Sequence, residues 1–464
     1  MLFNSFVFLL LFLPITYCVF WALRTAQARY VWLVITGYVF YGYWDARFCL
    51  LMAFSTTVSY VAGRAFLAFA DRRSRKLCLI VPITVDLCLL GFFKYANFVT
   101  RIFGDLSQAL GWQTHLPYLA ITLPVGISFY TFHTITYIVD SYRGVIKPTR
   151  NIFEFAAYVS LFSQLVAGPI VRFRQVEEDL ESLGEARRSR WLAKGISFFV
   201  LGMIEKVIVA DGLASVVDPA LSRYATLSSA GVWLAMLGYA FQLYFDFSGY
   251  SDMAVGLGLM FGIRIPQNFA SPYKALDPSD FWRRWHISLS TCLRDYLYIP
   301  FGGNRHGQLA TYRNLMLTML IGGLWHGANW TFVVWGAYHG MLLLLYKCVE
   351  SRWDLLPKAL RQTAIFILVT IGWVLFRSSD FGMAQALLRA MFFPTPGTLV
   401  DHCAVYIVGL VVAGLWAFVG PHSFQIFDRF EWKRPYAYAL SLAMGSCIAV
   451  MLGRGNSPFL YFQF

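Results

Sequence analysis

Charged residues are scarce in this sequence. They make up 14% of its 464 residues, whereas hydrophobic residues make up 58%. Soluble domains are about one quarter charged, so this composition excludes an ordinary soluble protein. The ten-residue alternating strands of a membrane β-barrel are missing as well. The apolar runs instead have the length of bilayer-spanning helices, which predicts an all-α, multi-spanning integral membrane protein.

Hydrophilic intervals long enough to form a separate domain are also absent. We therefore expect one polytopic membrane domain over residues 1–464. The segments expected to span the bilayer are residues 6–21, 31–44, 48–70, 77–99, 155–169, 192–217, 232–261, 315–330, 331–348, 365–376, 405–418 and 436–452. "LPVGISFYTFHTITYIVD" (Leu123–Asp140) and the segments beside Trp330 are short or glycine-rich, so we expect re-entrant helices there.

Acidic residues are fewer than basic ones, with 25 Asp and Glu against 38 Lys and Arg. In a multi-spanning protein, an excess of basic residues in cytoplasmic loops explains this imbalance without a nucleic-acid partner. The densest basic runs, "DRRSRK" (71–76) and "EARRSRWLAK" (185–194), are therefore assigned to the cytoplasm. We expect the lipid bilayer to surround the protein.

Several common catalytic and metal-binding patterns do not occur. The eight cysteines show no C-x-x-C spacing and the histidines no H-x-x-x-H spacing, which argues against a metal or redox centre. The G-x-S-x-G turn of serine hydrolases and glycine-rich phosphate loops are missing too. We expect neither a metal nor a bound cofactor.

Polar residues inside apolar segments are candidates for function, because each ionisable one costs a few kcal/mol to insert. The stretch "YFDFSGYSDM" places Asp246 and Asp252 within a long apolar run. These carboxyl groups would either form polar contacts between helices or bind substrate.

A second polar cluster is "DFWRRWHISLSTCLRDYLYIPFGGNR" (280–305). On a helical wheel, Arg283, Ser290 and Arg294 fall within about 80° of His286. One interpretation is an interfacial helix whose arginines meet lipid phosphates. The other is a cationic vestibule for a phosphate-bearing donor, since the arginine fork binds phosphate in bidentate fashion.

A third cluster is "GGLWHGANWTFVVWGAYHG" (322–340), which contains two histidines. On one continuous helix, His326 shares a face with Asn329, whereas His339 lies about 220° away from His326. The two imidazoles would then point apart, unless the helix is interrupted at Gly336. A single histidine on an apolar helix is more often a packing residue than a catalyst, so spacing alone leaves its role open.

These motifs together resemble the membrane-bound O-acyltransferase (MBOAT) family, in its bacterial exopolysaccharide O-acetyltransferase branch. The resemblance rests on "FWRRWHISLS", "LRDYLYIPFGGNR" and "LTMLIGGLWHGANWTFVVWGAYHG", within residues 264–345. It extends to "LPVGISFYTF", "QLVAGPIVRF" and "QLYFDFSGYSDMAVGLGLMFGIRIPQNF". It implies a ring of tilted helices with a central constriction, and two catalytic histidines: His326 of the W-H-G motif and His286 of the R-W-H-x-S motif.

The resemblance also implies a function. Family members take an acyl group from a cytoplasmic thioester and pass it to an acceptor. We expect a multi-pass O-acetyltransferase of the bacterial inner membrane, with acetyl-CoA as its donor substrate. The expected partner is a periplasmic acetyl-relay protein of a polysaccharide biosynthesis complex, and the polymer would be alginate or cellulose.

These expectations combine into a mechanistic hypothesis. His326 acts as general base toward an acceptor hydroxyl, since imidazole titrates near neutrality. His286 orients the donor or the acceptor, or stabilises the developing oxyanion. The candidate substrate-binding residues are Arg283, Ser290, Arg294, Asn329, Asp246 and Asp252. The alternatives from other functional classes are a transporter or flippase of polysaccharide precursors and a structural subunit of a secretion complex.

Overall fold

The computed structural model describes residues 1–112, 119–185, 191–428, 432–454 and 459–460. Within these ranges the chain is helical, and its only β-type pairing is an isolated bridge between Leu227 and Thr398. Five helices are long and apolar enough to cross a membrane. They are α3 (Arg47–Ala68), the continuous run of α4 and α5 (Arg72–Ala109), α15 (Trp330–Trp353), α16 (Lys358–Arg377) and α20 (Arg434–Arg454). The predicted all-α, multi-pass membrane class is thus confirmed.

The chain forms two compact units. The first comprises residues 1–192 and 257–266, and the second comprises residues 193–256 and 267–464. The 32-residue helix α11 (Ser229–Met260) belongs mainly to the second unit, and its last turn to the first. We predicted a single domain that forms a ring of helices with a central constriction. These features depend on how the two units are placed together, so they stay predictions.

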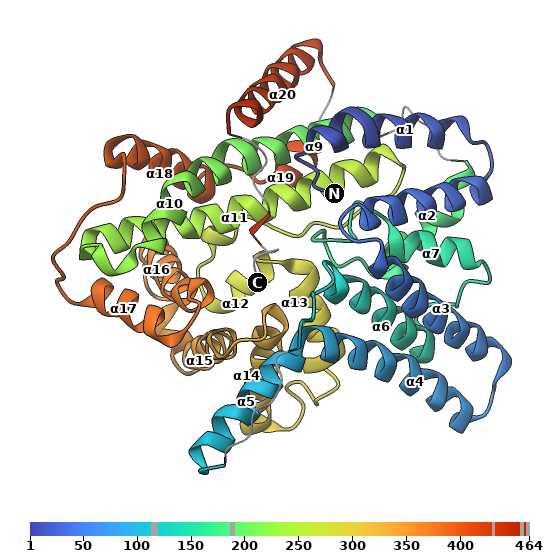
Figure 1. Ribbon diagram of the computed structural model, residues 1–464, viewed down its shortest axis with the longest axis horizontal. Helices are drawn as coiled ribbons and strands as arrows, with labels where there is room; N and C mark the ends of the chain where they lie inside the picture. The colour runs from blue at the N-terminus through green and yellow to red at the C-terminus, as the bar shows by residue number, and fades with distance from the viewer. Residues whose placement is uncertain (113–118, 186–190, 429–431, 455–458, 461–464) are drawn as a thin grey trace. The chain divides into compact units, whose positions relative to one another are not determined.

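The first unit is built around a buried carboxyl group. Its remaining helices are α1 (Leu13–Ala22), α2 (Ala26–Gly42), α4 (Arg72–Leu90), α5 (Ala96–Ala109), α6 (Ile127–Arg143), α7 (Ile152–Ser160) and α8 (Phe173–Glu181). Helices α3, α4 and α6 pack side by side (Figure 1). Asp86 on α4 accepts hydrogen bonds of 2.6 Å from Ser55 on α3 and Thr134 on α6. This one carboxyl group therefore connects all three helices.

One expected span of the first unit is wrong. Residues 155–169 were predicted to form a single helix, but α7 ends at Ser160 and residues 161–172 are irregular and buried. Gly126, with φ of +77°, lies directly against the backbone carbonyl of Leu165. Irregular backbone at membrane depth is tolerated where protein covers it, and here protein does so.

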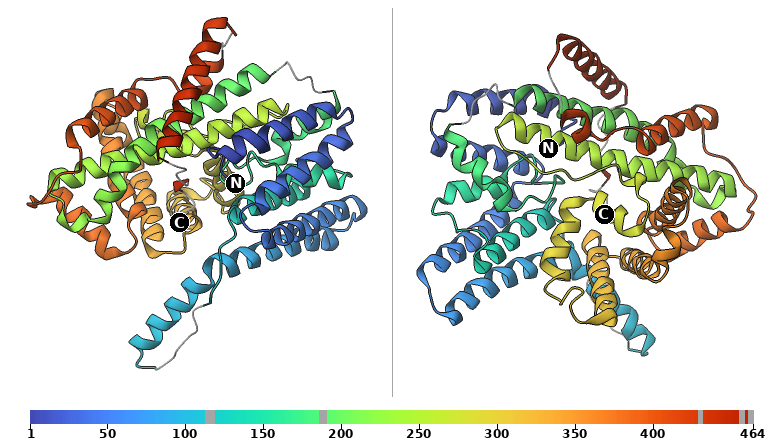
Figure 2. Two further views of the ribbon diagram at one scale, coloured as in Figure 1. Left: turned by 45° about the horizontal axis from the view of Figure 1, so that its top comes forward. Right: turned by 180° about the vertical axis from the view of Figure 1, so that it is seen from behind.

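The second unit carries both histidine motifs. Its other helices are α9 (Leu192–Met203), α10 (Asp211–Ser222), α12 (Pro278–Arg284), α13 (Ile287–Leu293), α14 (Gly307–His326), α17 (Phe381–Phe392), α18 (Cys403–Phe418) and α19 (Ser423–Asp428). Helices α14 and α15 form a hairpin, and α16 packs against α15 (Figure 1). Within this unit, α20 contacts the π-helical segment Ile204–Ala210, and one end of α20 projects outward (Figure 2).

The structure describes the first of the two basic runs fully and the second only in part. Asp71 begins the first run and caps α4 by accepting a 2.7 Å hydrogen bond from the backbone N–H of Ser74, which lowers the pKa of the Asp71 carboxyl group. In the second run, residues 186–190 lie outside the described residues.

Candidate active site

His286 occupies a special backbone position between α12 and α13. Its φ and ψ of +44° and +55° are in the left-handed region, which a non-glycine residue enters at a cost of about 1–3 kcal/mol. Its side chain is fully buried. Strain of this kind is concentrated at functional sites, and here it points the imidazole inward between two short helices.

Asn268 fixes the orientation of His286. The Asn268 Oδ1 atom accepts from the backbone N–H of Ser288 at 3.2 Å, so this atom is the acceptor end of the amide. His286 Nδ1 lies 3.0 Å from the same oxygen and must carry the hydrogen. The Asn268 amide nitrogen donates to Ser251 Oγ at 3.1 Å. His286 Nε2 is therefore left with a lone pair, and it has no partner among the described residues.

His326 is the last residue of α14, and the helix does not continue beyond it. Residues 327–329 are non-helical, and α15 begins at Trp330. Asn329 caps α15 by accepting a 3.2 Å hydrogen bond from the backbone N–H of Thr331, and its amide nitrogen donates to Ser379 O at 2.7 Å. The continuous helix assumed for the wheel is thus wrong, and the interruption lies at Gly327 rather than at Gly336.

Two tryptophans connect His286, His326 and His339. The Trp325 ring lies 6.1 Å from the His286 ring and 5.0 Å from the His326 ring, measured between centroids. The Trp335 ring lies 5.0 Å from that of His326 and 4.9 Å from that of His339. His326 and His339 therefore face the same indole, contrary to the expectation that they point apart.

The predicted cationic face around His286 is not formed. The Arg283 and Arg294 side chains are 64% and 59% exposed and lie near Asp280 and Asp295, whereas His286 is buried. Ser290 donates its hydroxyl hydrogen to the carbonyl of Trp285 at 3.1 Å. The wheel fails because the left-handed turn at His286 separates two helices with different axes.

Asp246 and Asp252 on α11 have different partners. Asp246 pairs with Lys206 at 2.5 Å and accepts a 2.9 Å hydrogen bond from the backbone N–H of Leu460. Asp252 accepts a 2.9 Å hydrogen bond from Ser423. Both carboxyl groups thus engage other elements of the second unit. Lys206 was missed, although a lysine within the apolar run 192–217 is a readable signal.

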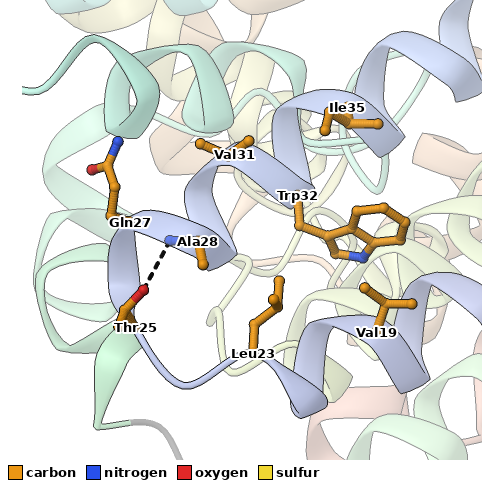
Figure 3. Close-up of a pocket in the computed structure, with 8 residues that line it drawn as sticks. All are labelled: Val19, Leu23, Thr25, Gln27, Ala28, Val31, Trp32 and Ile35. Atoms are coloured by element: carbon orange, nitrogen blue, oxygen red, sulfur yellow. Dashed lines mark hydrogen bonds between the residues drawn. The ribbon is translucent and has the colours of Figure 1, made fainter.

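A surface pocket of about 440 Å³ lies between α1 and α2 in the first unit (Figure 3). Its lining is Val19, Leu23, Thr25, Gln27, Ala28, Val31, Trp32 and Ile35. Thr25 closes one end, where its hydroxyl caps α2 by accepting from Ala28 N at 3.2 Å. None of the predicted site residues lines this pocket.

Comparisons with known proteins identify the family. The chain matches the membrane-bound O-acyltransferase family over residues 140–376, about half of its length. The probable alginate O-acetylase AlgI of Azotobacter vinelandii is 44% identical over 424 residues, which cover 89% of this chain and 83% of that protein. The chain belongs to the MBOAT family. It is accordingly an O-acyltransferase.

Other MBOAT relatives are named for other polymers. The peptidoglycan O-acetyltransferase of Helicobacter pylori is 36% identical over 425 residues, covering 84% of this chain and 80% of that protein. The teichoic acid D-alanyltransferase of Bacillus subtilis is 28% identical over 290 residues, covering 60% and 73%. The names of these relatives thus share the transfer of an acyl group and differ in the polymer.

Proposed function

We propose that this protein transfers acetyl groups from cytoplasmic acetyl-CoA across the bacterial inner membrane for O-acetylation of an exopolysaccharide. Alginate is favoured over cellulose because the relative from Azotobacter vinelandii is named for alginate. The acceptor is a hydroxyl of a periplasmic relay protein, which then modifies the polymer. MBOAT membership favours this function over a transporter or a structural subunit.

One observation carries the chemical part of the proposal. His326 and His286 are both buried, and a single indole, that of Trp325, contacts both imidazoles. In this mechanism His326 is the general base. Its imidazole accepts the hydroxyl proton while the hydroxyl oxygen bonds to the thioester carbonyl carbon, and the carbonyl electron pair moves onto oxygen. Collapse of this intermediate breaks the C–S bond, and the CoA thiolate takes the proton from His326.

The hydrogen bond to Asn268 narrows the role of His286. Because Nδ1 carries the hydrogen, Nε2 offers a lone pair and cannot donate a hydrogen bond in this tautomer. Such an atom suits a partner with a hydrogen to give, and not an oxyanion. The hydrogen of the reacting hydroxyl goes to His326, so His286 is assigned to orienting the donor, whose pantetheine amide N–H groups can donate to Nε2. The proposal involves no resident metal or cofactor.

The proposal is tested by His326→Ala in cells that make the polysaccharide. Loss of a general base lowers the rate about 10²- to 10⁴-fold, so acetyl ester in the secreted polymer should fall below detection. His402→Asn, at an exposed histidine before α18, is the control and should leave acetylation unchanged. Normal acetylation by a correctly inserted His326→Ala protein would refute the assignment.

The donor is tested separately with inverted membrane vesicles prepared from the same cells. Acetyl-CoA labelled in its acetyl group is supplied outside these vesicles, at the former cytoplasmic face. Free CoA thiol should appear there, and labelled polymer or relay protein should appear inside. If neither labelled acceptor nor free CoA forms, although the same cells acetylate their polymer, acetyl-CoA is excluded as the donor.

A further inference from the structure

The indoles around His326 differ from other indoles of this protein in their hydrogen bonding. Several described indole N–H groups donate to protein oxygens: Trp32 to Thr16 O, Trp233 to Met391 O, Trp353 to Leu276 O and Trp373 to Tyr273 Oη. The Nε1 atoms of Trp282 and Trp335 are buried and have no partner among the described residues. Leaving a buried donor unsatisfied costs about 1–3 kcal/mol, so two adjacent ones call for an explanation.

These two indoles lie in one cluster next to the candidate base. Their ring centroids are 5.8 Å apart. The Trp335 ring stands edge to face against His326, with centroids at 5.0 Å and an interplanar angle of 88°. Thr331 and His339 lie one turn on either side of Trp335 on α15, and Thr331 Oγ1 and His339 Nε2 are likewise buried without a described partner. The unsatisfied atoms thus form a row along one face of α15.

The chemistry of an indole restricts what this cluster binds. Its N–H group is a donor only, so the missing partner must present an acceptor atom. The carbonyl oxygen of a thioester is such an acceptor, and it gains negative charge when a hydroxyl attacks. His286 is unsuited to stabilising that charge, because its free Nε2 atom carries a lone pair. The mechanism therefore lacks a donor at the oxyanion, and Trp335 is in contact with the imidazole where the oxyanion forms.

We propose that the indole N–H of Trp335 donates a hydrogen bond to the carbonyl oxygen of the acyl donor, and that this bond strengthens as the oxyanion forms. Trp282 supplies a second donor to the same ligand, at an acceptor further along the donor molecule. This inference rests on the proposed acetyl-CoA chemistry at His326. It assigns the donor class, a carbonyl-bearing thioester, to the face of α15 that carries Thr331, Trp335 and His339.

The kinetic test compares Trp335→Phe with Trp353→Phe. Both variants keep an aromatic ring on α15 and lose one N–H group, but only Trp353 already donates within the protein, to Leu276 O at 2.8 Å. Removing one oxyanion donor costs about 10²- to 10³-fold in kcat, so Trp335→Phe should lose CoA release in inverted vesicles to this extent. Its KM for acetyl-CoA should change little, and Trp353→Phe should keep the wild-type kcat.

Benzothienylalanine at position 335 separates loss of the N–H group from loss of side-chain packing. It keeps a bicyclic ring and replaces the N–H group with sulfur. It should therefore lose the same activity as Trp335→Phe while melting at or above the wild-type temperature, because the unsatisfied donor is gone. A kcat within about twofold of wild type in this variant overturns the inference. An inactive wild-type protein with acetyl-CoA would instead refute the proposed function, so the two failures are distinguishable.

A spectroscopic readout does not depend on turnover. Acetyl-CoA labelled with ¹³C at the carbonyl is bound to the His326→Ala protein, and its carbonyl stretch is recorded by difference infrared spectroscopy. A hydrogen bond from Trp335 lowers this frequency, so His326→Ala/Trp335→Phe should show a higher one. The same frequency in both proteins would show that the N–H group does not reach the carbonyl oxygen, and would overturn the inference.

Discussion

His326 and His339 pack against the same indole, that of Trp335, with centroid distances of 5.0 and 4.9 Å. They are 13 residues apart and would point in different directions on a single helix. The interruption at residues 327–329 gives α14 and α15 separate axes, and the hairpin then brings both imidazoles to one side chain. His339 is therefore part of the wall around His326, although no reaction step is assigned to it.

The close approach of α14 and α15 should be sensitive to one methyl group. A Cβ atom at Gly336 would lie directly against the carbonyl oxygen of Met319. Gly336→Ala should therefore force the hairpin apart and cost about 1–3 kcal/mol in stability, the usual range for overpacking. Since His326 ends α14, activity should fall as well. Thermal unfolding in detergent and CoA release measure the two effects.

Gly104→Ala is the matched control for this change. Gly104 is also helical, on α5, but a Cβ there would meet no atom within 4 Å. Alanine is the better helix former by about 0.5–1 kcal/mol, so Gly104→Ala should be neutral or slightly stabilising. If Gly336→Ala melts like Gly104→Ala, the α14 and α15 backbones are not in the close contact described.

Asn268 should act on activity through His286. Asn268→Ala removes the acceptor that holds Nδ1–H, and the imidazole becomes free to turn or to change tautomer. Misplacing a reacting group by about 1 Å costs on the order of 10²-fold, so kcat should fall by about that factor. The pH dependence of kcat should change as well, because the imidazole loses the hydrogen bond that its Nδ1–H group donates.

Asn314→Ala is the control for this prediction. Asn314 is equally buried in the same unit, but its amide donates to Gly303 O at 3.0 Å and not to His286, His326 or His339. Both variants should lose stability, and only Asn268→Ala should lose most of its kcat. Equal losses of kcat in the two variants would mean that Asn268 has only a structural role.

The sequence predicts the class of this fold well, because a helix that crosses the hydrocarbon core of a bilayer needs a long apolar run with few charges. It predicts helix interruptions less well. The interruption before Trp330 was readable, since Asn329 has the residue type and position of an N-cap. The end of α7 was not readable, because the helix stops at Ser160, eight residues before the Gly168–Pro169 pair at which the expected span ended.

The turn at His286 could not be predicted in this way. Residues 284–287 contain neither glycine nor proline, and the left-handed conformation is held by contacts distant in sequence. Asn268 accepts from the backbone N–H of Ile287 through its carbonyl at 2.8 Å and from Ser288 through its side chain. Such tertiary contacts override local propensity, so the wheel placed Arg283 and Arg294 on a face that does not exist.

The exposed arginines remain candidates for binding the nucleotide of CoA. Arg283 has only loose ion pairs, at 3.8 Å to Asp277 and 3.6 Å to Asp280, so its guanidinium group is available to a phosphate. Arg283→Gln should raise the KM for acetyl-CoA several-fold and leave kcat unchanged, because it removes ground-state binding. Steady-state CoA release at several salt concentrations measures this effect, and the difference from wild type should shrink as salt increases.

Acetylpantetheine separates this role from a structural one. It carries the same thioester without the nucleotide phosphates, so wild type and Arg283→Gln should use it equally well. If Arg283→Gln loses activity equally with acetyl-CoA and with acetylpantetheine, Arg283 supports the fold of α12 and does not bind phosphate.

His422 should make stability depend on pH below neutrality. Its pKa is lowered from the ordinary value of 6.5 by burial and by the positive charges of Lys274 and Arg284. Its Nδ1 atom also accepts from Gln267 Nε2 at 3.2 Å and from the backbone N–H of Gln425 at 3.3 Å, and protonation of Nδ1 would break both bonds.

The direction follows from proton linkage. The unfolded chain binds the proton more readily than the folded protein does, so this contribution to stability is complete above about pH 6.5 and is lost as the pH falls through the lowered pKa. Between pH 7.5 and 5.5, the melting temperature of wild type should therefore fall more steeply than that of His422→Gln, whose side chain at position 422 does not titrate. The glutamine carbonyl can still accept from Gln425 N–H, so the two proteins should melt similarly at pH 7.5. If the melting temperatures of the two proteins change equally with pH across this range, Lys274 and Arg284 do not lower the pKa of His422 in the folded protein.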